Sequence, residues 1–183
     1  MTARHRSTAD SGPRSPVRPA GPGDIARIVE IRAKVAAEGR WIGAEGPLDT
    51  AEAAARLRDA LADEKFGVFV AEIDGMVCGS ATVRFTGRGV TEFGMMLTSD
   101  QRGRGLGGDL LTRVIDWSRE HGAHKIALQV WPHNARALAL YARAGFEVEG
   151  VLRAHYPRRN GELWDAVVMG LPLSEAARRR GPR

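Results

Sequence analysis

Residues 101–108 read QRGRGLGG and hold four glycines within six residues. They follow an apolar run at 90–98 and lead into an amphipathic run at 105–120, so they join an expected strand to an expected helix. Glycines at such a junction let the backbone approach a ligand closely, and they leave the first N–H groups of the helix free to bind phosphate. Arg102 and Arg104 add positive charge at the same place. The stretch therefore predicts a site for a phosphorylated cofactor, against the alternative of a turn that only connects.

Two common phosphate-binding patterns do not fit this stretch. Gly103, Gly105 and Gly108 match the G-x-G-x-x-G spacing of dinucleotide-binding folds, which need an acidic residue about 20 residues further on for the ribose. No Asp or Glu lies between His121 and Phe146. The Gly-Lys-Ser/Thr ending of nucleoside triphosphate loops is also absent. The sequence thus disfavours both a dinucleotide and a nucleoside triphosphate.

Outward from this stretch, the hydrophobic periodicity predicts an α/β fold with a mixed, mostly antiparallel central sheet. Three consecutive β runs with short links, the first two joined at Asp74-Gly75, predict an antiparallel meander. Another turn, Arg158-Arg159-Asn160-Gly161, separates the last two runs. Helices are expected at 25–38, 50–62, 105–120 and 134–144, and about seven strands at 17–20, 66–75, 76–85, 90–98, 125–131, 146–154 and 163–171.

The 183 residues and the distribution of charge indicate one domain with basic ends. The net charge is +3 in residues 1–19, +3 in residues 174–183 and −1 in residues 20–173. We therefore expect a disordered basic tail at 1–15, a single domain at 16–173 and a basic tail at 174–183. A basic face for nucleic acid is not expected on the body of the protein.

Composition excludes several other classes. No apolar run reaches the roughly 18 residues that a membrane span needs, and no apolar leader is visible at the N-terminus, so no membrane association and a cytoplasmic location are expected. A single cysteine, Cys78, can form neither an internal disulfide nor a cysteine-based zinc site. The five histidines form no metal-binding pattern. We expect Cys78 to be a buried core thiol rather than an acetyl-carrying nucleophile, and we expect no metal.

Two motifs carry a resemblance to a known family. Residues 102–107, RGRGLG, resemble the R-x-x-G-x-G pyrophosphate loop of the GCN5-related N-acetyltransferases (the GNAT family). Residues 134–146, NARALALYARAGF, resemble the second family motif, Asn-x-x-Ala-x-x-Leu-Tyr followed by Gly-Phe, and the spacing between the two motifs also fits. Residues 149–173 are similar to the closing strands of the family. The resemblance extends from about Val17 to Leu173.

The resemblance implies a central sheet flanked by four helices, with a splayed pair of strands for the cofactor. It implies acetyl-CoA as co-substrate and transfer of the acetyl group to a primary amine by direct attack in a ternary complex. The acceptor stays open among small molecules, amino acids and protein N-termini. A non-catalytic acyl-CoA-binding module on the same fold is the alternative. The sequence does not decide the oligomeric state, and a homodimer stays open because family members commonly pair.

Main-chain contacts to the cofactor follow from the same resemblance. The backbone of Met95, Met96 and Leu97 would pair with the pantetheine arm, with an N–H near Met96 as the oxyanion donor. Asn134 would cap its helix and could also bond the cofactor. The cofactor contacts implied are therefore Met95, Met96, Leu97, Arg102, Gly103, Arg104, Gly105, Leu106, Gly107 and Asn134.

Catalytic and acceptor residues are implied in the same way. Tyr141 occupies the motif position of the general acid, with a packing role as the alternative. Glu92, the only acidic residue in the run 90–98, would act as a base or hold a water relay, unless it simply faces outward. Trp41, Glu45 and Trp164 would shape the acceptor pocket, with rim packing as the alternative.

Overall fold

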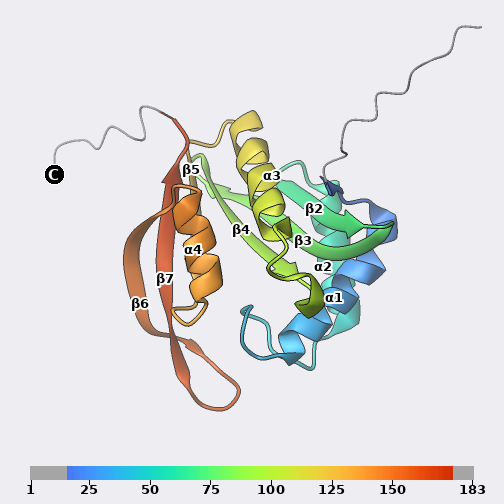
Figure 1. Cartoon of the computed structure of the whole chain (residues 1–183), viewed down its shortest axis with the longest axis horizontal. Helices are drawn as coiled ribbons and strands as arrows, with labels where there is room; N and C mark the ends of the chain where they lie inside the picture. The colour runs from blue at the N-terminus through green and yellow to red at the C-terminus, as the bar shows by residue number, and fades with distance from the viewer. Residues whose placement is uncertain (1–15, 175–183) are drawn as a thin grey trace, which may run out of the picture.

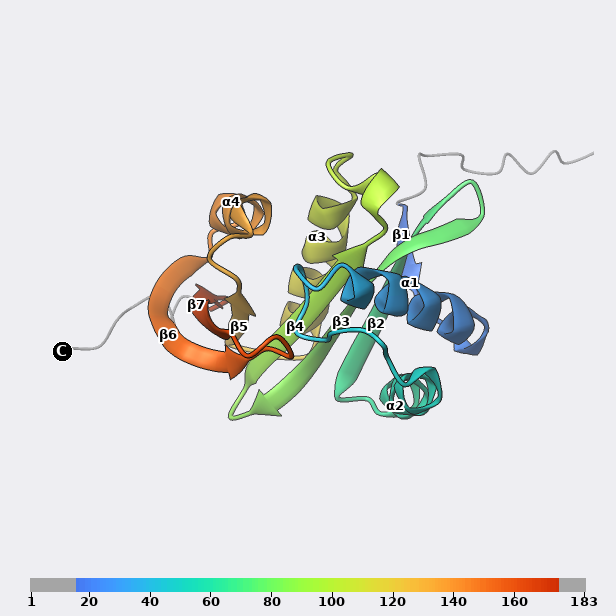
Figure 2. The same cartoon turned by 90° about the horizontal axis from the view of Figure 1, so that it is seen from below.

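Seven strands in residues 16–174, the part of the chain described by this computed structural model, form one mixed sheet in the order β1-β2-β3-β4-β5-β7-β6 (Figure 1). Helices α1 and α2 cover one face, and α3 and α4 cover the other (Figure 2). The strands are β1 (Val17–Pro19), β2 (Phe66–Ile73), β3 (Met76–Gly87), β4 (Val90–Leu97), β5 (Lys125–Val130), β6 (Glu147–Pro157) and β7 (Leu163–Pro172). The helices are α1 (Ile25–Ala37), α2 (Thr50–Ala62), α3 (Leu106–Glu120) and α4 (Ala135–Arg143), with 3-10 turns at Pro22–Asp24 and Ser99–Gln101.

This arrangement confirms the predicted fold class, and each expected helix and strand is present within a few residues of its expected bounds. The predicted tail at 1–15 lies outside the described residues, as does the tail at 174–183 apart from Ser174. No helix among residues 16–174 is long and apolar enough to cross a membrane.

The antiparallel meander of β2, β3 and β4 is confirmed. Asp74 and Gly75 both have positive φ, 50° and 76°, in the two-residue turn between β2 and β3. Such turns match the right-handed twist of the two strands, and Asp and Gly adopt them readily. Local sequence chemistry therefore determines the start of the sheet.

The core lies on both faces of the sheet. Leu110 and Val114 of α3 pack against one face beside Val83, which has no exposed surface. On the other face, Ile31 of α1 packs among the side chains beneath α1 and α2. A third cluster, beneath α4, includes Ile126 of β5. The helices that border the site are thus anchored to the sheet by apolar burial.

A break in strand pairing positions the site. β4 pairs with β3 from Val90 to Leu97, but it pairs with β5 only over Val90–Glu92, opposite Lys125–Ala127. Beyond Glu92, β5 continues beside β7 alone. From Phe93 to Leu97, β4 therefore has no partner residue on β5, as the family resemblance implied.

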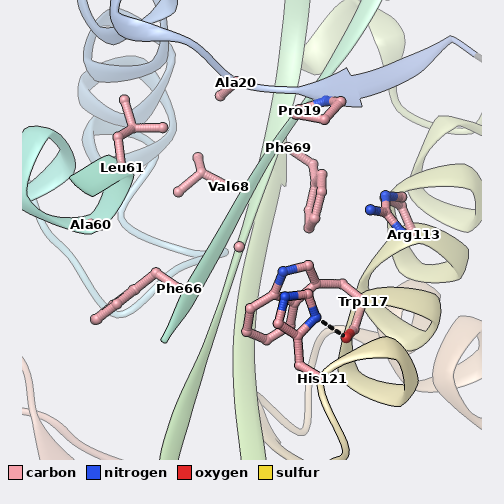
Figure 3. A pocket seen from close by; sticks show the side chains of 11 residues that line it. Pro19, Ala20, Ala60, Leu61, Phe66, Val68, Phe69, Arg113, Trp117 and His121 are labelled. Carbon is pink, nitrogen blue, oxygen red and sulfur yellow. Dashed lines mark hydrogen bonds between the residues drawn. The ribbon is translucent and has the colours of Figure 1, made fainter. Parts of the chain in front are cut away.

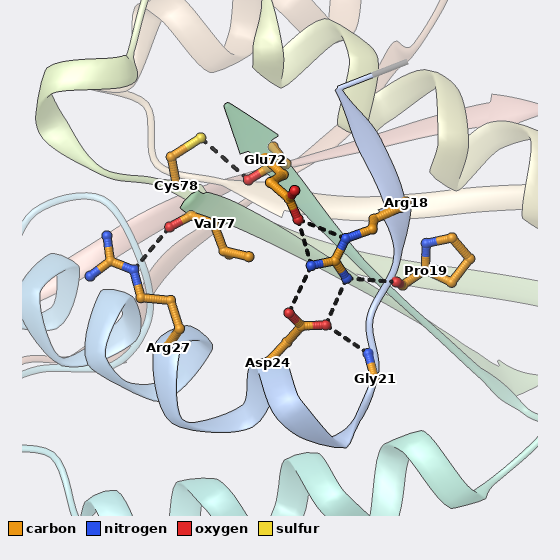
Figure 4. Close-up of polar contacts among 9 residues, drawn as sticks. Arg18, Pro19, Gly21, Asp24, Arg27, Glu72, Val77 and Cys78 are labelled. Carbon is orange, nitrogen blue, oxygen red and sulfur yellow. Dashed lines mark hydrogen bonds and ion pairs between the residues drawn. The ribbon is translucent and has the colours of Figure 1, made fainter. Parts of the chain in front are cut away.

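Ion pairs fix the N-terminal edge of the sheet (Figure 4). Arg18 of β1 contacts Asp24 at 2.8 Å and Glu72 of β2 at 2.6 Å. The hydrogen bond from Arg18 holds the pKa of Asp24 below its ordinary value. Asp24 also accepts the N–H of Gly21. This network joins the first strand, the first turn and β2.

Cys78 lies close to that network and is buried (Figure 4). Its Sγ donates to the carbonyl of Ala71 at 3.3 Å. Burial raises the pKa of the thiol, so it stays protonated. The expectation of a core thiol is confirmed.

We predict that Leu110→Ala lowers the free energy of unfolding by about 2–5 kcal/mol, because the side chain is completely buried and its removal leaves a cavity. Met76→Ala is the control, because Met76 is 62% exposed and its truncation should change stability by less than about 0.5 kcal/mol. Urea denaturation measures both. Equal losses would contradict the placement of α3 on this core.

Candidate active site

A single cleft of about 1120 Å³ opens where β4 and β5 separate. Its walls come from β4, β5, the first turn of α3, α4 and the loop between α1 and α2. The glycine stretch lies along one part of the lining, and Trp41, Gln129 and Tyr156 lie along another. The volume is slightly above the range typical of ligand pockets, roughly 300–1,000 Å³, as suits a cleft for two substrates. One cavity thus reaches from the predicted cofactor loop to the predicted acceptor region.

The unpaired edge of β4 offers main-chain groups to this cleft. The N–H of Thr98 donates to the carbonyl of Cys78 on β3 at 2.9 Å, and the β3–β4 register is unbroken from there back to Thr91. In an antiparallel ladder, alternate residues direct both backbone groups to the same neighbour. The backbone N–H and C=O of Met96 therefore point to β3, and those of Met95 and Leu97 point away from β3, although all three residues line the cleft. The oxyanion donor expected near Met96 is better placed at Met95.

The glycine stretch positions the start of α3 at the cleft. Gly105 is the N-cap of α3 with φ of 94°, a left-handed conformation that favours glycine, and no side chain caps the helix. The N–H of Gly108 donates to the Gly105 carbonyl at 2.7 Å, which leaves the N–H groups of Leu106 and Gly107 available for a ligand. Gly103, Gly105, Gly107 and Gly108 line the cleft. Arg104 and Leu106 are not part of the lining: Leu106 is buried in the core, and Arg104 is exposed.

Arg102 lines the cleft, but its guanidinium is already paired. Its Nη atoms donate to Glu38 at 2.6 and 2.7 Å, and its Nε donates to the Leu97 carbonyl at 3.1 Å. The hydrogen bond from Arg102 holds the pKa of Glu38 below its ordinary value. Glu38 also accepts the indole N–H of Trp41 at 2.6 Å. The structure thus gives Arg102 a supporting role in place of the expected free positive charge for phosphate.

A different arginine, Arg136, lies beside the glycine loop. The Nη1 atom of Arg136 lies 3.3 Å from the position that a Cβ on Gly103 would take, so its guanidinium covers the glycine loop. Arg136 and Arg143, both on α4, line the cleft. Sequence reasoning missed both. The signal was present in the second motif, where Arg136 follows the N-cap Asn134 by two residues.

Asn134 and Tyr141 lie on the α4 wall of the cleft. Asn134 accepts the N–H of Ala137 at 3.2 Å, so its role as N-cap is confirmed. The ring of Tyr141 is buried and packs edge-on against Phe93 at 5.7 Å between centroids. None of residues 16–174 hydrogen-bonds its hydroxyl, and burial raises the pKa of the phenol well above its ordinary value. Tyr141 therefore holds its proton beside the cleft.

Glu92 lies at the closed end of the cleft and does not line it. It occupies the last position at which β4 and β5 pair. Its neighbours in sequence, Thr91 and Phe93, direct their side chains to the α3 and α4 face, so Glu92 faces the opposite side of the sheet. Arg84 on β3 lies directly across from it, with 3.4 Å between Nη2 and Oε2. Tyr141 and Glu92 thus approach the splay from opposite faces.

The structure separates the three predicted acceptor residues. Trp41 lines the cleft, as expected, but Glu45 and Trp164 do not. The carboxylate of Glu45 pairs with Arg158 at 3.3 Å and accepts the backbone N–H of Arg159 at 3.1 Å. Trp164 packs against the guanidinium of Arg158. Glu45 and Trp164 lie outside the lining of the cleft because both contact Arg158, whose buried guanidinium attracts a carboxylate and aromatic rings.

A second cavity, of about 320 Å³, lies between α2, β2 and α3 (Figure 3). Apolar side chains form most of its lining, with Arg113 and His121 at one side. Nδ1 of His121 is 2.8 Å from the carbonyl of Trp117, whose ring it stacks on. No predicted site residue lies there. Within residues 16–174 there is also no cluster of three His, Cys, Asp or Glu side chains fit to hold a metal ion. The cleft at the splay remains the candidate site.

Known proteins agree with this geometry. The profile of the Acetyltransferase (GNAT) family matches residues 35–146, which include both sequence motifs. An L-methionine sulfoximine/L-methionine sulfone acetyltransferase from Pseudomonas paraeruginosa is 34% identical over 163 residues, which cover 86% of this chain and 94% of the relative.

Solved structures give the same result. A ribosomal-protein-alanine N-acetyltransferase from Brucella melitensis has a TM-score of 0.79 and 28% identity, and the match covers 86% of this chain and 99% of that one. A Salmonella typhimurium structure determined with its cofactor acetyl-CoA has a TM-score of 0.78 and 26% identity, with 91% and 96% covered.

We predict that Gly108→Glu weakens acetyl-CoA binding at least tenfold without loss of stability. A Cβ on Gly108 meets nothing within 4 Å, and an acidic residue in the first turn of a helix is favourable. A carboxylate there would repel a pyrophosphate by about 4 kcal/mol at 4 Å and an effective dielectric constant of 20. Titration calorimetry measures the affinity.

Gly108→Gln is the matched control, since it has the same size without the charge and should bind more tightly than Gly108→Glu. Equal weakening in both variants would make the effect steric. Unchanged affinity in the glutamate variant would remove the pyrophosphate from this loop.

Proposed function

Since the chain belongs to the GNAT acetyltransferase family and transfers the acetyl group of acetyl-CoA to an amine, we propose that its acceptor is the α-amino group of a small amino acid with an uncharged side chain. The observation that carries this proposal is the closure of the acceptor end of the cleft. There the loop between α1 and α2, residues 38–49, is bonded to the hairpin of β6 and β7.

The residues of the cleft fit acetyl-CoA. Both backbone groups of Met95 and the N–H of Leu97 are offered to the two amides of the pantetheine arm, as an exposed strand edge is to a peptide, whereas the Leu97 carbonyl already accepts Nε of Arg102. The first turn of α3 and the guanidinium of Arg136 suit the pyrophosphate. When bound, acetyl-CoA supplies an acetyl group activated as a thioester.

Hydrogen bonds between the α1–α2 loop and the opposite side of the cleft favour a small acceptor. His133, which follows β5, contacts the carbonyl of Arg40 in the loop at 2.9 Å. The side chains of Arg158 and Arg159 in the hairpin donate hydrogen bonds to carbonyls of the loop, and the carboxylate of Glu45 in the loop accepts the backbone N–H of Arg159. A peptide would need an open path beyond its first residue, and these bonds narrow that path.

The lining of the acceptor end supports an uncharged side chain. Trp41, Trp131 and Tyr156 present aromatic surface, and the hydroxyl of Tyr156 donates to Gln129. Apolar and neutral polar groups are poor partners for a charged side chain. The relative from Pseudomonas paraeruginosa is named for L-methionine sulfoximine and L-methionine sulfone, which are amino acids with uncharged sulfur groups.

Arg84 and Glu92 lie outside the lining of the cleft, next to its closed end, and we propose that the head group of the acceptor reaches them there. An amino acid carries an ammonium and a carboxylate on one carbon, and these residues present the opposite charges on adjacent strands. The Arg84–Glu92 pair is long, 3.4 Å, and both side chains are about half exposed, so each can take a new partner. We assign Arg84 to the carboxylate and Glu92 to the amine.

The proposed mechanism is direct attack in a ternary complex. Glu92, directly or through a water molecule, accepts a proton from the amine so that its lone pair is free. The N–H of Met95 donates to the thioester oxygen as negative charge develops there. Tyr141 donates a proton to the departing sulfur. Cys78 takes no part, because its thiol is buried, stays protonated and does not line the cleft.

We predict that the enzyme acetylates L-methionine sulfone faster than either its amide or a peptide that begins with the same residue. Arg84→Gln should raise KM for the free amino acid about 10- to 100-fold, which corresponds to loss of a charged hydrogen bond worth about 1.5–3 kcal/mol. It should leave KM for the amide nearly unchanged. Release of free CoA thiol measures all three acceptors. Preference for the peptide would contradict the proposed acceptor, and an equal effect on the amide would contradict the role of Arg84.

We predict that Tyr141→Phe lowers kcat by roughly 10²–10⁴-fold, the usual contribution of a general acid. Affinity for acetyl-CoA and the melting temperature should change little, because the ring is kept and the hydroxyl has no partner among residues 16–174. Since burial raises the pKa of the phenol, the wild-type enzyme should lose no activity through Tyr141 as the pH rises to 10. Unchanged kcat would remove Tyr141 from the acid role, and a large loss of melting temperature would support the packing alternative.

A further inference from the structure

One buried arginine holds the loop between α1 and α2 against the β6–β7 hairpin. The side chain of Arg158 is only 2% exposed. Its Nη1 donates to the carbonyl of Gly43 at 3.1 Å, and its Nη2 donates to the carbonyl of Gly39 at 3.3 Å. Both carbonyls belong to the loop, more than 100 residues away in sequence. Arg158 therefore makes a long-range connection between two segments that local propensity does not bring together.

Aromatic rings and a carboxylate complete the surroundings of Arg158. Its Cζ lies 4.3 Å from the ring centroid of Trp164 and 5.6 Å from that of Trp131. Glu45, also in the loop, places Oε1 3.3 Å from Nη2. A buried charge is costly unless it is paired and hydrogen-bonded. The loop supplies the carboxylate and both carbonyls that contact Nη1 and Nη2, whereas Nε of Arg158 has no hydrogen-bond partner among residues 16–174. Undocking the loop would therefore remove every polar partner of the Nη atoms and leave the buried charge unpaired.

The docked loop forms part of the acceptor end of the cleft. Trp41 and Gly43 of the loop line the cavity, and so do Trp131 and Tyr156 on the opposite side. Arg158 does not line it. It lies behind the lining, with its Cζ 5.6 Å from the ring centroid of Trp131 and its Nη1 bonded to the Gly43 carbonyl. Its contacts can therefore reach the acceptor only through these lining residues.

We propose that Arg158 is a positioning residue that latches the loop and thereby sets the affinity for the acceptor amine. The choice of an amino acid as acceptor rests on the proposed function above, whereas the latch applies to whichever amine is acetylated. The planar guanidinium contacts two carbonyls, a carboxylate and two indole rings at once, and the smaller ammonium of lysine cannot reproduce this set.

The test compares Arg158→Lys and Arg158→Met with Arg153→Met. Arg153 is on β6, five residues before Arg158; its side chain is 84% exposed, and the carboxylate of Asp165 is 4.0 Å away. Both Arg158 variants should raise KM for the acceptor about 10-fold or more, with a smaller rise for lysine. KM for acetyl-CoA should stay within about twofold, because the glycine loop and α3 are untouched. Arg153→Met should resemble wild type.

Limited trypsin digestion supplies a readout that needs no acceptor. Arg40 is exposed in the loop, and the loop residues after it contain no other Lys or Arg before α2. Cleavage after Arg40 should be several-fold faster in both Arg158 variants, with the melting transition still cooperative. If wild type acetylates no amino acid but trypsin still distinguishes the variants, the proposed acceptor fails and the latch stands.

Two results would overturn the latch. One is a folded Arg158→Met protein with wild-type acceptor KM and wild-type cleavage after Arg40. The other is an equal rise of both KM values, which would indicate a general structural role. If Arg158→Met does not fold, Arg158→Lys decides the same questions, because it keeps the buried charge.

Discussion

The cleft exists because β4 pairs with its two neighbouring strands, β3 and β5, over unequal lengths. It pairs with β3 over eight positions of the register but with β5 over only three. Beyond Glu92 its free edge has no strand partner, and apart from the Leu97 carbonyl, which accepts Nε of Arg102, its peptide groups need water or a ligand to bond them. The glycine-capped start of α3 and the inward side of α4 meet this edge and enclose the cleft. In the binding mode that we propose, the cofactor-binding groups are therefore mostly backbone groups, and Arg102 of the glycine loop is already paired with Glu38.

The loop between α1 and α2 links the two ends of the cleft. At its beginning, Glu38 bonds to Arg102 beside the glycine loop, and Trp41 bonds to Glu38. Further along, the carbonyl of Gly43 bonds to Arg158 of the hairpin. One short segment thus contacts both the cofactor side and the acceptor side. Sequence changes in this loop can alter acceptor recognition while the sheet stays the same.

Sequence alone predicted what depends on neighbouring residues. The Asp74-Gly75 turn, the N-cap Asn134 and the glycine stretch follow from local backbone preferences, and they are where the sequence placed them. Pairings across the fold were not accessible. Arg102 and Glu38 are 64 residues apart, and no periodicity shows that they meet. Glu45 was assigned to substrate for the same reason, since its partner Arg158 is known only from the tertiary structure. Likewise, the side of β4 that Met96 faces depends on the register with β3.

The opposite surroundings of Tyr141 and Glu92 fit the direction in which protons must move. Acetylation of an ammonium group releases one proton to the medium and leaves one on the thiol. Tyr141 is buried, and its raised pKa prevents it from acting as a base at neutral pH. Glu92 is about half exposed on the other face, where water can carry a proton away. A buried proton donor and a solvent-exposed proton acceptor would impose one order on the steps. The amine would lose a proton first, then attack the thioester, and the thiol would be protonated last. We therefore read the splayed strands as a partition between two proton environments as well as a passage for the cofactor.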